Sequence, residues 1–291
     1  MMGLAEPVAI AAHDAGAANI ILAWVAAEGL GGCRAVMAGP AAALWRARFG
    51  EAGLVANLEE AMAGAAALVS GTGWASDLEH EARRLARARG VWSVGVIDHW
   101  VNYRQRFERG GELALPDVIW VTDEHALEKA RREIPEAPLE MKPNLYLAEQ
   151  VAGAGPRPEN GDLLFVSEPT RDNWGRGALG EFQALDYLVA LRDAATIPPA
   201  VRLRIRPHPS ETPDKFDAWI AAHPGSQLDR SADMAEALRG AGWVAGLQSV
   251  ALVIADAAGR TAISALPPGA PECPLPHRGL MHLKNIASRV E

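Results

Sequence analysis

A first group of side chains suited to phosphate chemistry lies in the C-terminal half of the chain. Arg206-Pro207-His208-Pro209 follows the apolar segment Val201–Ile205, and the two prolines stiffen the turn from which an arginine and a histidine project. The guanidinium group offers a planar fork of donors to phosphate oxygens, and the imidazole can donate a hydrogen bond or a proton near neutral pH. The alternative is structural: His208 would cap the next helix, and Arg206 would be a solvated edge residue.

A second candidate phosphate site is a Gly-Leu-Gln-Ser sequence that ends at Ser249, just before a helix expected from Val250. A serine hydroxyl and the first N–H groups of a helix can bind an anion together. Gln248 and Ser249 are therefore predicted to bind a nucleotide phosphate, together with Ser167 and Glu168, which end another expected strand of the same half. Ser249 could equally be an ordinary N-cap.

The N-terminal half offers a group for proton transfer. His13 and Asp14 follow the first apolar segment and place a carboxylate beside an imidazole, ahead of a helix start rich in small residues. Such a pair could deprotonate an acceptor hydroxyl. Asp14 could instead be only the N-cap of the helix that begins near Ala17.

A polar and aromatic stretch, Asp98–Phe107, follows a later apolar segment and has residues that often bind sugars. Trp100 offers a face for C–H packing, while carboxylate, amide and guanidinium groups offer partners for hydroxyls. The alternative places Trp100 and Phe107 in the core and the arginines on a solvated helix face. With a Gly-Thr-Gly loop that allows close backbone approach, the predicted acceptor- or sugar-binding residues are His13, Thr72, Gly73, Asp98, His99, Trp100, Asn102 and Arg106.

The elements that position these residues are short apolar strands alternating with amphipathic helices, which is typical of an α/β fold with a parallel sheet. In the first half we expect strands at Val8–Ala12, Cys33–Ala38, Ala66–Ser70, Trp92–Ile97 and Val118–Val121, and helices at Ala17–Glu28, Ala41–Phe49 and Asp77–Arg89. In the second half we expect strands at Leu163–Val166, Val201–Ile205, Trp243–Ala245 and Thr261–Ala265, and helices at Gly180–Ala194, Pro213–Ala222, Ala232–Ala241 and Val250–Ala258.

The segment Leu147–Asp162 is rich in Ala, Gly, Pro and polar residues without periodicity, which is typical of an interdomain linker. We therefore expect an N-terminal Rossmann-like domain over residues 1–150 and a C-terminal one over residues 160–291, facing a cleft. Because ligands of open α/β sheets collect at the carboxyl ends of the strands, the polar residues named above are in suitable places.

Composition excludes several classes of protein. The 291 residues are 49% hydrophobic and 22% charged with a formal net charge of −8, so neither disorder nor a general attraction to nucleic acid is indicated. Cys33 and Cys273 lie far apart and indicate neither a disulfide framework nor a zinc site, and no HExxH, paired-His or DxD sequence points to a metal. The chain has no GxGxxG after its first strand, no GxxxxGK[ST] and no GxSxG. Without a signal peptide or an apolar span, a cytoplasmic location is expected.

Two α/β halves, with Arg206-Pro207-His208-Pro209 and the later Gly-Leu-Gln-Ser sequence in the second half, resemble the GT-B class of nucleotide-sugar glycosyltransferases. The bacterial capsule and surface-polysaccharide transferases, and among them the sialyltransferase-like and polysialyltransferase-like members, are the most similar. Their His-Pro motif and Ser-rich helix start bind the donor phosphate, which implies these roles for His208 and Ser249. Their acidic base in an N-terminal loop implies that role for Asp14, with Asp98 as reserve, although the acidic pair and the serine pair of that family are not reproduced here.

The resemblance implies a metal-independent glycosyltransferase that needs no cofactor and moves a sugar from a nucleotide-sugar donor to a glycan or small-molecule acceptor. Asp14 and His208 would be catalytic, with Arg206, His208 and Ser249 stabilising the charge that develops on the leaving phosphate. Two alternatives remain. One is an epimerase or hydrolase of nucleotide sugars with the same two-domain fold, and the other is a nucleotide-sugar-binding protein without catalytic activity.

Overall fold

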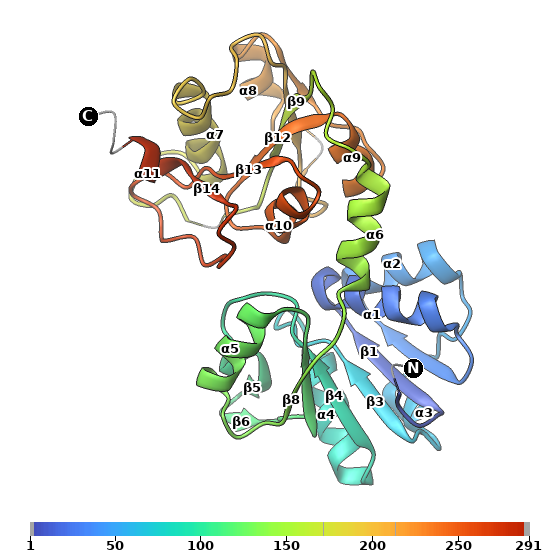
Figure 1. The fold of residues 1–291 in the computed structure, drawn as a ribbon. Helices are drawn as coiled ribbons and strands as arrows, with labels where there is room; N and C mark the ends of the chain where they lie inside the picture. The colour runs from blue at the N-terminus through green and yellow to red at the C-terminus, as the bar shows by residue number, and fades with distance from the viewer. Residues whose placement is uncertain (1–2, 171, 213, 288–291) are drawn as a thin grey trace. The chain divides into compact units, whose positions relative to one another are not determined.

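The computed structural model describes residues 3–170, 172–212 and 214–287, which form two compact units (Figure 1). Unit 1 comprises Met1–Tyr146, and unit 2 comprises Leu147–Glu291. Each unit is built on its own six-stranded parallel sheet, so the expected α/β class with two Rossmann-like sheets is confirmed.

The sheet of unit 1 has the strand order β2-β1-β3-β4-β7-β8. Its strands are β1 (Val8–Ala12), β2 (Cys33–Met37), β3 (Ala67–Ser70), β4 (Trp92–Val96), β7 (Val118–Val121) and β8 (Leu139–Met141). Its helices are α1 (Ala15–Glu28), α2 (Gly39–Phe49), α3 (Leu58–Met62), α4 (Leu78–Arg89) and α5 (Glu124–Glu133), with a 3₁₀ turn η1 (Arg104–Phe107) and a short hairpin of β5 (Glu108–Arg109) and β6 (Glu112–Leu113).

Both faces of this sheet are buried, as the alternation of side chains along β1 shows. Val8 and Ile10 belong to the core beneath α1 and α2, where Trp24 of α1 meets Trp120 of β7 edge to face at 5.4 Å. Ala9 and Ala11 point to the other side, into the core made with α3 and α4. Successive residues of a strand point to opposite faces, so a strand covered on both sides is apolar throughout.

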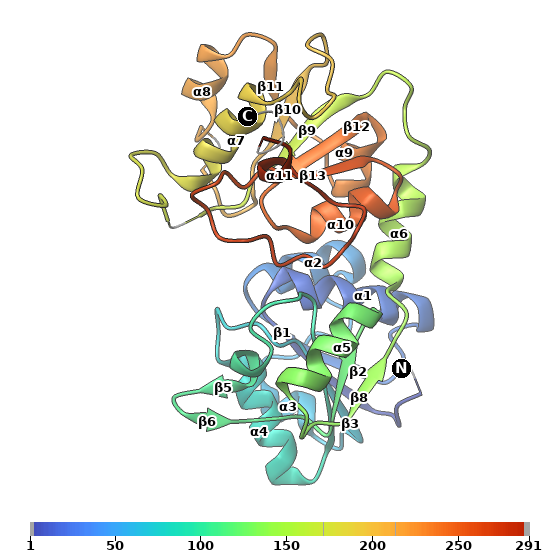
Figure 2. The ribbon, with the colours of Figure 1, turned by 60° about the vertical axis from the view of Figure 1, so that its left-hand side comes forward.

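The sheet of unit 2 has the strand order β11-β10-β9-β12-β13-β14. Its strands are β9 (Asp162–Val166), β10 (Leu203–Arg206), β11 (Ser226–Leu228), β12 (Ala241–Gly246), β13 (Thr261–Ser264) and β14 (Met281–His282). Its helices are α6 (Leu145–Ala154), which begins at the end of unit 1, α7 (Gly180–Ala190), α8 (Asp217–Ala222), α9 (Met234–Arg239), α10 (Val250–Ala257) and α11 (Leu283–Ala287). The stretch between β13 and β14 forms a wide loop at one side of this unit (Figure 2).

The elements expected from the pattern of apolar residues are present, with ends that differ by a few residues. The larger differences have physical reasons: β8, β11 and β14 are short edge or near-edge strands whose residues are half-exposed and therefore lack a continuous apolar run. Helix α8 begins only at Asp217, and Pro213, where it was expected to begin, lies outside the described residues.

The expectation of an irregular linker was wrong for the first part of Leu147–Asp162, where α6 extends to Ala154. The final carbonyls of this helix have protein partners. Arg239 donates to Gly153 O, and the buried Arg260 donates to Ala154 O and Gly155 O. Satisfying these otherwise unpaired carbonyls stabilises a helix end that local composition does not predict.

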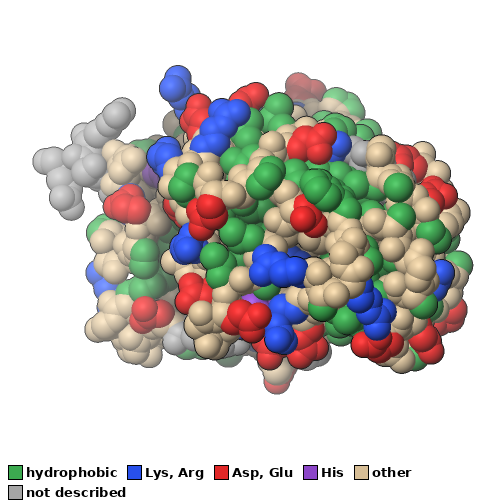
Figure 3. Space-filling model, turned by 90° about the horizontal axis from the view of Figure 1, so that it is seen from below, with side chains coloured by type: hydrophobic (Ala, Val, Ile, Leu, Met, Phe, Trp, Pro, Cys, Tyr) green, Lys and Arg blue, Asp and Glu red, His purple; other side chains and the backbone are tan. Residues whose placement is uncertain are grey.

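The surface carries charges of both signs side by side. On the described part of the face drawn in Figure 3, Lys and Arg side chains are interspersed with Asp and Glu. None of the helices in the described ranges combines the length and apolar content that crossing a membrane requires.

Candidate functional site

The strand order of unit 1 brings the N-terminal candidate residues together. The chain runs from β1 outward to β2 and then back to β3 on the other side of β1, so the order reverses between β1 and β3. Ligands of open α/β sheets bind at this kind of switch point, beyond the carboxyl ends of the strands. His13 and Asp14 follow β1 there, Gly73 lies in the loop after β3, and Asp98 follows β4.

His13 and Asp14 form a hydrogen-bonded pair. His13 Nδ1 lies 2.7 Å from Asp14 Oδ1, and the two side chains are 20% and 30% exposed. Since an ionised carboxylate only accepts, this contact places the proton of a neutral imidazole on Nδ1. Asp14 occupies the N-cap position of α1 but makes no side-chain cap hydrogen bond, so the alternative role as a side-chain cap is excluded.

A second carboxylate, Asp98, lies at the start of the same helix. Arg106 donates to Asp98 Oδ1 at 2.7 Å and to Val101 O, and the side chain of Arg106 is only 6% exposed. Asp98 packs directly on Gly16, the second residue of α1, at the positive end of the helix dipole. Arg106 thus holds Asp98 in place, which corrects the interpretation of Arg106 both as a sugar contact and as a solvated residue.

Glycine permits the close packing around these side chains. A Cβ atom on Gly16 would overlap Asp98, one on Gly73 would overlap Asp14, and one on Gly39 would overlap the ring of His13. The backbone at the starts of α1 and α2 and in the loop after β3 therefore packs directly around the His13–Asp14 pair and Asp98.

Two buried charged residues of α4, which the sequence pattern did not predict, form hydrogen bonds with the backbone of the loops that carry the site. Glu79 accepts the His13 N–H at 3.0 Å, and burial raises the pKa of its carboxyl group. Arg83 donates to Gly71 O and to Ala114 O, and burial lowers its pKa to about 10. Charged residues on a helix are usually assigned to its solvated face. Here Glu79 and Arg83 are four residues apart and share a helix face with the apolar Ala82 and Ala86, and this spacing is the feature of the sequence that could have indicated their burial.

Several other residues predicted to bind the acceptor are structural. Thr72 is fully buried and donates its hydroxyl to Val96 O, so its side chain is not offered to a ligand. Trp100 is 6% exposed, and its indole N–H donates to Asp123, as the core alternative proposed. Asn102 is exposed and has a left-handed φ of 56°, and His99 packs against Trp100; both stay predictions as sugar contacts.

In unit 2, the residues after β9, β10 and β12 lie at adjacent strand ends, and the strand order reverses between β9 and β12. Glu168, after β9, spans this point: its Oε1 accepts the N–H groups of Gln248 at 2.7 Å and Leu247 at 3.2 Å. Ser249 is the N-cap of α10, and its hydroxyl accepts the Ala251 N–H. The predicted anion site thus already holds an oxygen acceptor from the chain itself.

The carboxyl group of Glu168 has a pKa raised to about 7, because burial outweighs the three backbone N–H groups that favour its charged form. A neutral carboxylic acid and a carboxylate are therefore both accessible near neutral pH. The N–H groups just before α10 are occupied by an oxygen of Glu168, which would compete with any anionic ligand for them, and their use for a phosphate stays a prediction.

The loop of His208 is fixed by hydrogen bonds of its own. Glu211 accepts the His208 N–H at 2.6 Å and the hydroxyl of the buried Ser167 at 2.9 Å, and Lys215 pairs with Glu211. His208 Nδ1 lies 2.8 Å from the hydroxyl of Ser210. The alternative that His208 caps the next helix is wrong, since α8 begins only at Asp217. The hydroxyl of Ser167 therefore has a structural role, since it donates a hydrogen bond to Glu211.

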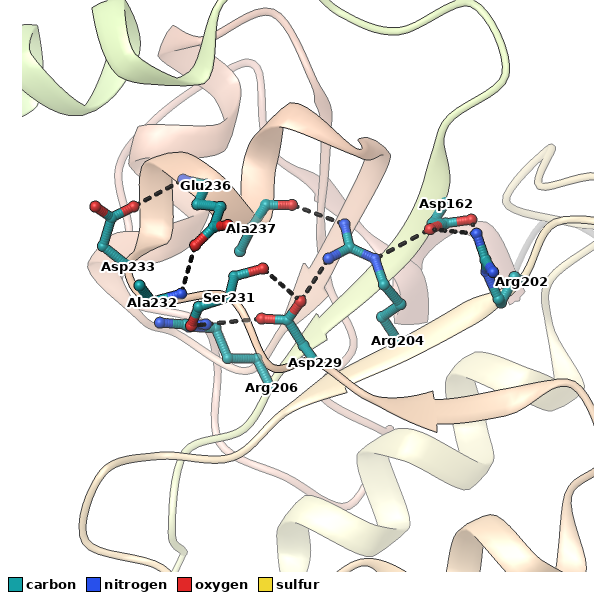
Figure 4. A network of polar contacts seen from close by, with 10 residues as sticks. All are labelled: Asp162, Arg202, Arg204, Arg206, Asp229, Ser231, Ala232, Asp233, Glu236 and Ala237. Atoms are coloured by element: carbon teal, nitrogen blue, oxygen red, sulfur yellow. Dashed lines mark hydrogen bonds and ion pairs between the residues drawn. The ribbon is translucent and has the colours of Figure 1, made fainter.

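The guanidinium group of Arg206 is turned toward the edge of the sheet (Figure 4). Its Nη1 donates to Asp229 Oδ2 at 2.7 Å and to Ser231 O at 2.9 Å, while Arg204 pairs with the other oxygen of Asp229. Asp229 is almost completely buried between the two arginines. Arg206 is therefore neither a solvated edge residue nor an uncommitted phosphate ligand, because part of its donor fork is already used by a buried carboxylate.

A cavity of about 710 Å³ lies beside the same network, along the edge strand β11. Its lining includes Arg204, Asp229, Arg230 and Glu236. The candidate residues after β9 and β12 do not line it. Within residues 3–170, 172–212 and 214–287, no three His, Cys, Asp or Glu side chains are grouped as metal ligands.

No protein-family model and no curated protein matches this chain. The solved structures with a similar fold include two that align over most of this chain. One, described as a UDP-N-acetylglucosamine 2-epimerase from Listeria monocytogenes, aligns with a TM-score of 0.63 and 12% identity over 98% of this chain and 87% of that chain. The other, a glycotransferase of kitacinnamycin, aligns with a TM-score of 0.53 and 12% identity over 97% of this chain and 86% of that chain. The chain therefore has a GT-B glycosyltransferase-like fold; at this identity the comparisons concern the fold alone.

Proposed function

We propose that this protein is a glycosyltransferase that transfers a sugar from a nucleotide-sugar donor to a hydroxyl of a glycan or small-molecule acceptor. The observation that carries the proposal is the His13–Asp14 pair at the switch point of unit 1. An ionised carboxylate hydrogen-bonded to an imidazole, part-exposed and held by close backbone packing, is suited to accept a proton from a hydroxyl.

In the proposed reaction, Asp14 takes the acceptor proton as the acceptor oxygen forms a bond to the anomeric carbon of the donor. The bond from that carbon to the donor phosphate breaks, and the phosphate leaves with the electron pair. His13 supports the reaction by its hydrogen bond to Asp14, which orients the carboxylate. No metal or cofactor takes part in these steps.

We assign the donor phosphate to unit 2, at the start of α10. The backbone N–H groups there already bind the oxygen of Glu168, which supports their use for a phosphate oxygen. His208 follows the neighbouring strand and is the proposed donor to the leaving group. A phosphate can take this place when Glu168 is protonated or turns away, since two anions would compete for the same donors.

The experiment is Asp14→Asn in the complete protein, which keeps the size of the side chain and removes its basicity. Turnover with a nucleotide-sugar donor is expected to fall by about 100-fold or more, while donor binding measured by the rise in thermal stability is unchanged. Glu51→Gln removes one charge from an exposed carboxylate of unit 1 and serves as the control. Unchanged turnover in Asp14→Asn would overturn the proposal.

A second candidate is an epimerase of nucleotide sugars. The observation that favours it is the second carboxylate, Asp98, fixed by Arg106 at the same helix end as Asp14. Epimerisation at carbon requires removal and return of a proton, for which two acid–base groups are useful. Turnover in D₂O distinguishes the two: epimerisation leaves deuterium on a sugar carbon of the product, and glycosyl transfer does not.

A further inference from the structure

Trp74, in the loop after β3, is 47% exposed although indole is among the largest apolar side chains. Trp74 directly follows Gly73, whose backbone packs against the carboxylate of Asp14. An exposed large aromatic side chain beside a chemically equipped site indicates a binding surface more strongly than a single exposed residue elsewhere.

One face of the Trp74 ring is covered by the guanidinium group of Arg106. The guanidinium carbon of Arg106 lies 5.3 Å from the centroid of the ring, within the range of a cation–π contact. Arg106 cannot move freely, because it is buried and donates to Asp98 and to Val101 O. The indole therefore rests on a rigid base, and binding a ligand against its exposed surface costs little side-chain entropy.

The polar groups around Trp74 favour an uncharged ligand. Arg106 is bound to Asp98, and Arg109 donates to Gly73 O and pairs with Asp77. Both arginines are thus engaged by protein oxygens, whereas Asp14 and Asp98 are carboxylates that accept hydrogen bonds. These two carboxylates would repel a phosphate, whereas they can accept hydrogen bonds from hydroxyl groups.

We propose that Trp74 is the stacking platform for a neutral pyranose ring of the acceptor. A pyranose has a C–H face that packs on an indole and hydroxyls at its rim that reach hydrogen-bond acceptors, which is the combination present here. This inference rests on the proposed function, since it names the class of acceptor for the same site and assigns its subsite to unit 1.

The test measures binding of neutral methyl glycopyranosides (glucoside, galactoside, mannoside and N-acetylglucosaminide) to the complete protein by saturation-transfer NMR. The wild-type protein is expected to transfer saturation to the C–H face of at least one of them. Trp74→Ala is expected to weaken that binding about tenfold or more, and Trp74→Phe, which keeps a ring, is expected to retain part of it.

Trp92→Ala is the matched control, because Trp92 is 50% exposed but lies at the start of β4, at the opposite end of the sheet. The Trp92→Ala variant is expected to bind the glycosides as tightly as the wild-type protein does. Equal weakening by Trp92→Ala and Trp74→Ala, undiminished binding in Trp74→Ala, or no binding of any glycoside to the wild type would each overturn the inference. Binding of uridine that depends on Trp74 would assign the platform to a nucleobase and would also overturn it.

The result separates this inference from the proposed function. Glycoside binding is expected to be retained for the most part in Asp14→Asn, since stacking does not need a base and the asparagine side chain keeps one oxygen that accepts a hydrogen bond. If Asp14→Asn keeps its turnover while Trp74→Ala loses glycoside binding, the proposed base is wrong and the platform stands. If Asp14→Asn loses turnover and Trp74→Ala binds glycosides normally, the platform is wrong and the base stands.

Discussion

Replacing Glu168 by glutamine should change how the stability of unit 2 depends on pH. Burial raises the pKa of this carboxyl group from 4.5 to about 7, against the lowering effect of the N–H groups of Leu247, Gln248 and Ser249. Because the folded-state pKa is the higher one, the contribution of Glu168 to stability is fully present below pH 4.5 and is lost as the pH rises through about 7.

The size of this effect follows from the two pKa values. At about 1.4 kcal/mol for each pKa unit, the shift from 4.5 to about 7 corresponds to at most about 3 to 4 kcal/mol between acidic and alkaline conditions. Glutamine keeps an oxygen that can accept from Leu247 and Gln248 but never ionises. Glu168→Gln should therefore differ least from the wild type at pH 5, and its stability relative to the wild type should rise by about 1 to 3 kcal/mol between pH 5 and pH 8.

The assay is amide hydrogen exchange of β9 and β12 in the complete protein, together with urea unfolding, at pH 5, 6, 7 and 8. Comparing wild type and variant at the same pH removes the intrinsic pH dependence of exchange. Glu159→Gln, at an exposed position of unit 2, is the control and should show no pH-dependent difference. A difference between Glu168→Gln and the wild type that stays constant across this range would refute the reasoning.

Two further predictions concern unit 1. Gly73→Ala places a methyl group against the carboxylate of Asp14 and should lower kcat/KM by about 100-fold, because it misplaces the proposed base. Gly31→Ala is the control and should leave kcat/KM unchanged, because the space around Gly31 is open. Equal activities of the two variants would contradict the packing argument. Arg83→Met leaves two buried carbonyls without their donor and should lower the free energy of unfolding by about 3 kcal/mol. Arg84→Met, which removes an exposed ion pair, is the control and should lower it by less than about 1 kcal/mol. A comparable loss from both variants in urea unfolding would show that burial is not the cause.

Most of the fold could be predicted from the sequence because buried parallel strands are apolar without interruption. Val8–Ala12 and Val118–Val121 have the expected bounds, and both are covered on two faces or nearly so. The strands that escaped prediction are those that burial does not mark. β11 and β14, for example, are short, and none of their residues is fully buried. Only pairing with a neighbouring strand defines them.

The positions of the candidate site residues could be predicted from the sequence, but their hydrogen-bond and ion-pair partners could not. Rules on strand ends locate His13, Asp14 and Asp98 correctly near one switch point. The partner of Arg206, in contrast, is Asp229, 23 residues further along the chain, and no local pattern indicates that pairing. Glu168 likewise meets Gln248 across 80 residues. Long-range ion pairs and hydrogen bonds of this kind depend on tertiary structure alone.

The most direct test of the central claim is product analysis of the wild-type protein with CMP-, UDP- and GDP-sugars, each offered with a mixture of glycan acceptors, followed by mass spectrometry. The account predicts that one donor is consumed, that the acceptor gains one sugar for each nucleotide released, and that Asp14→Asn forms neither product at a comparable rate. Consumption of no donor, or release of sugar and nucleotide without any glycoside, would contradict it.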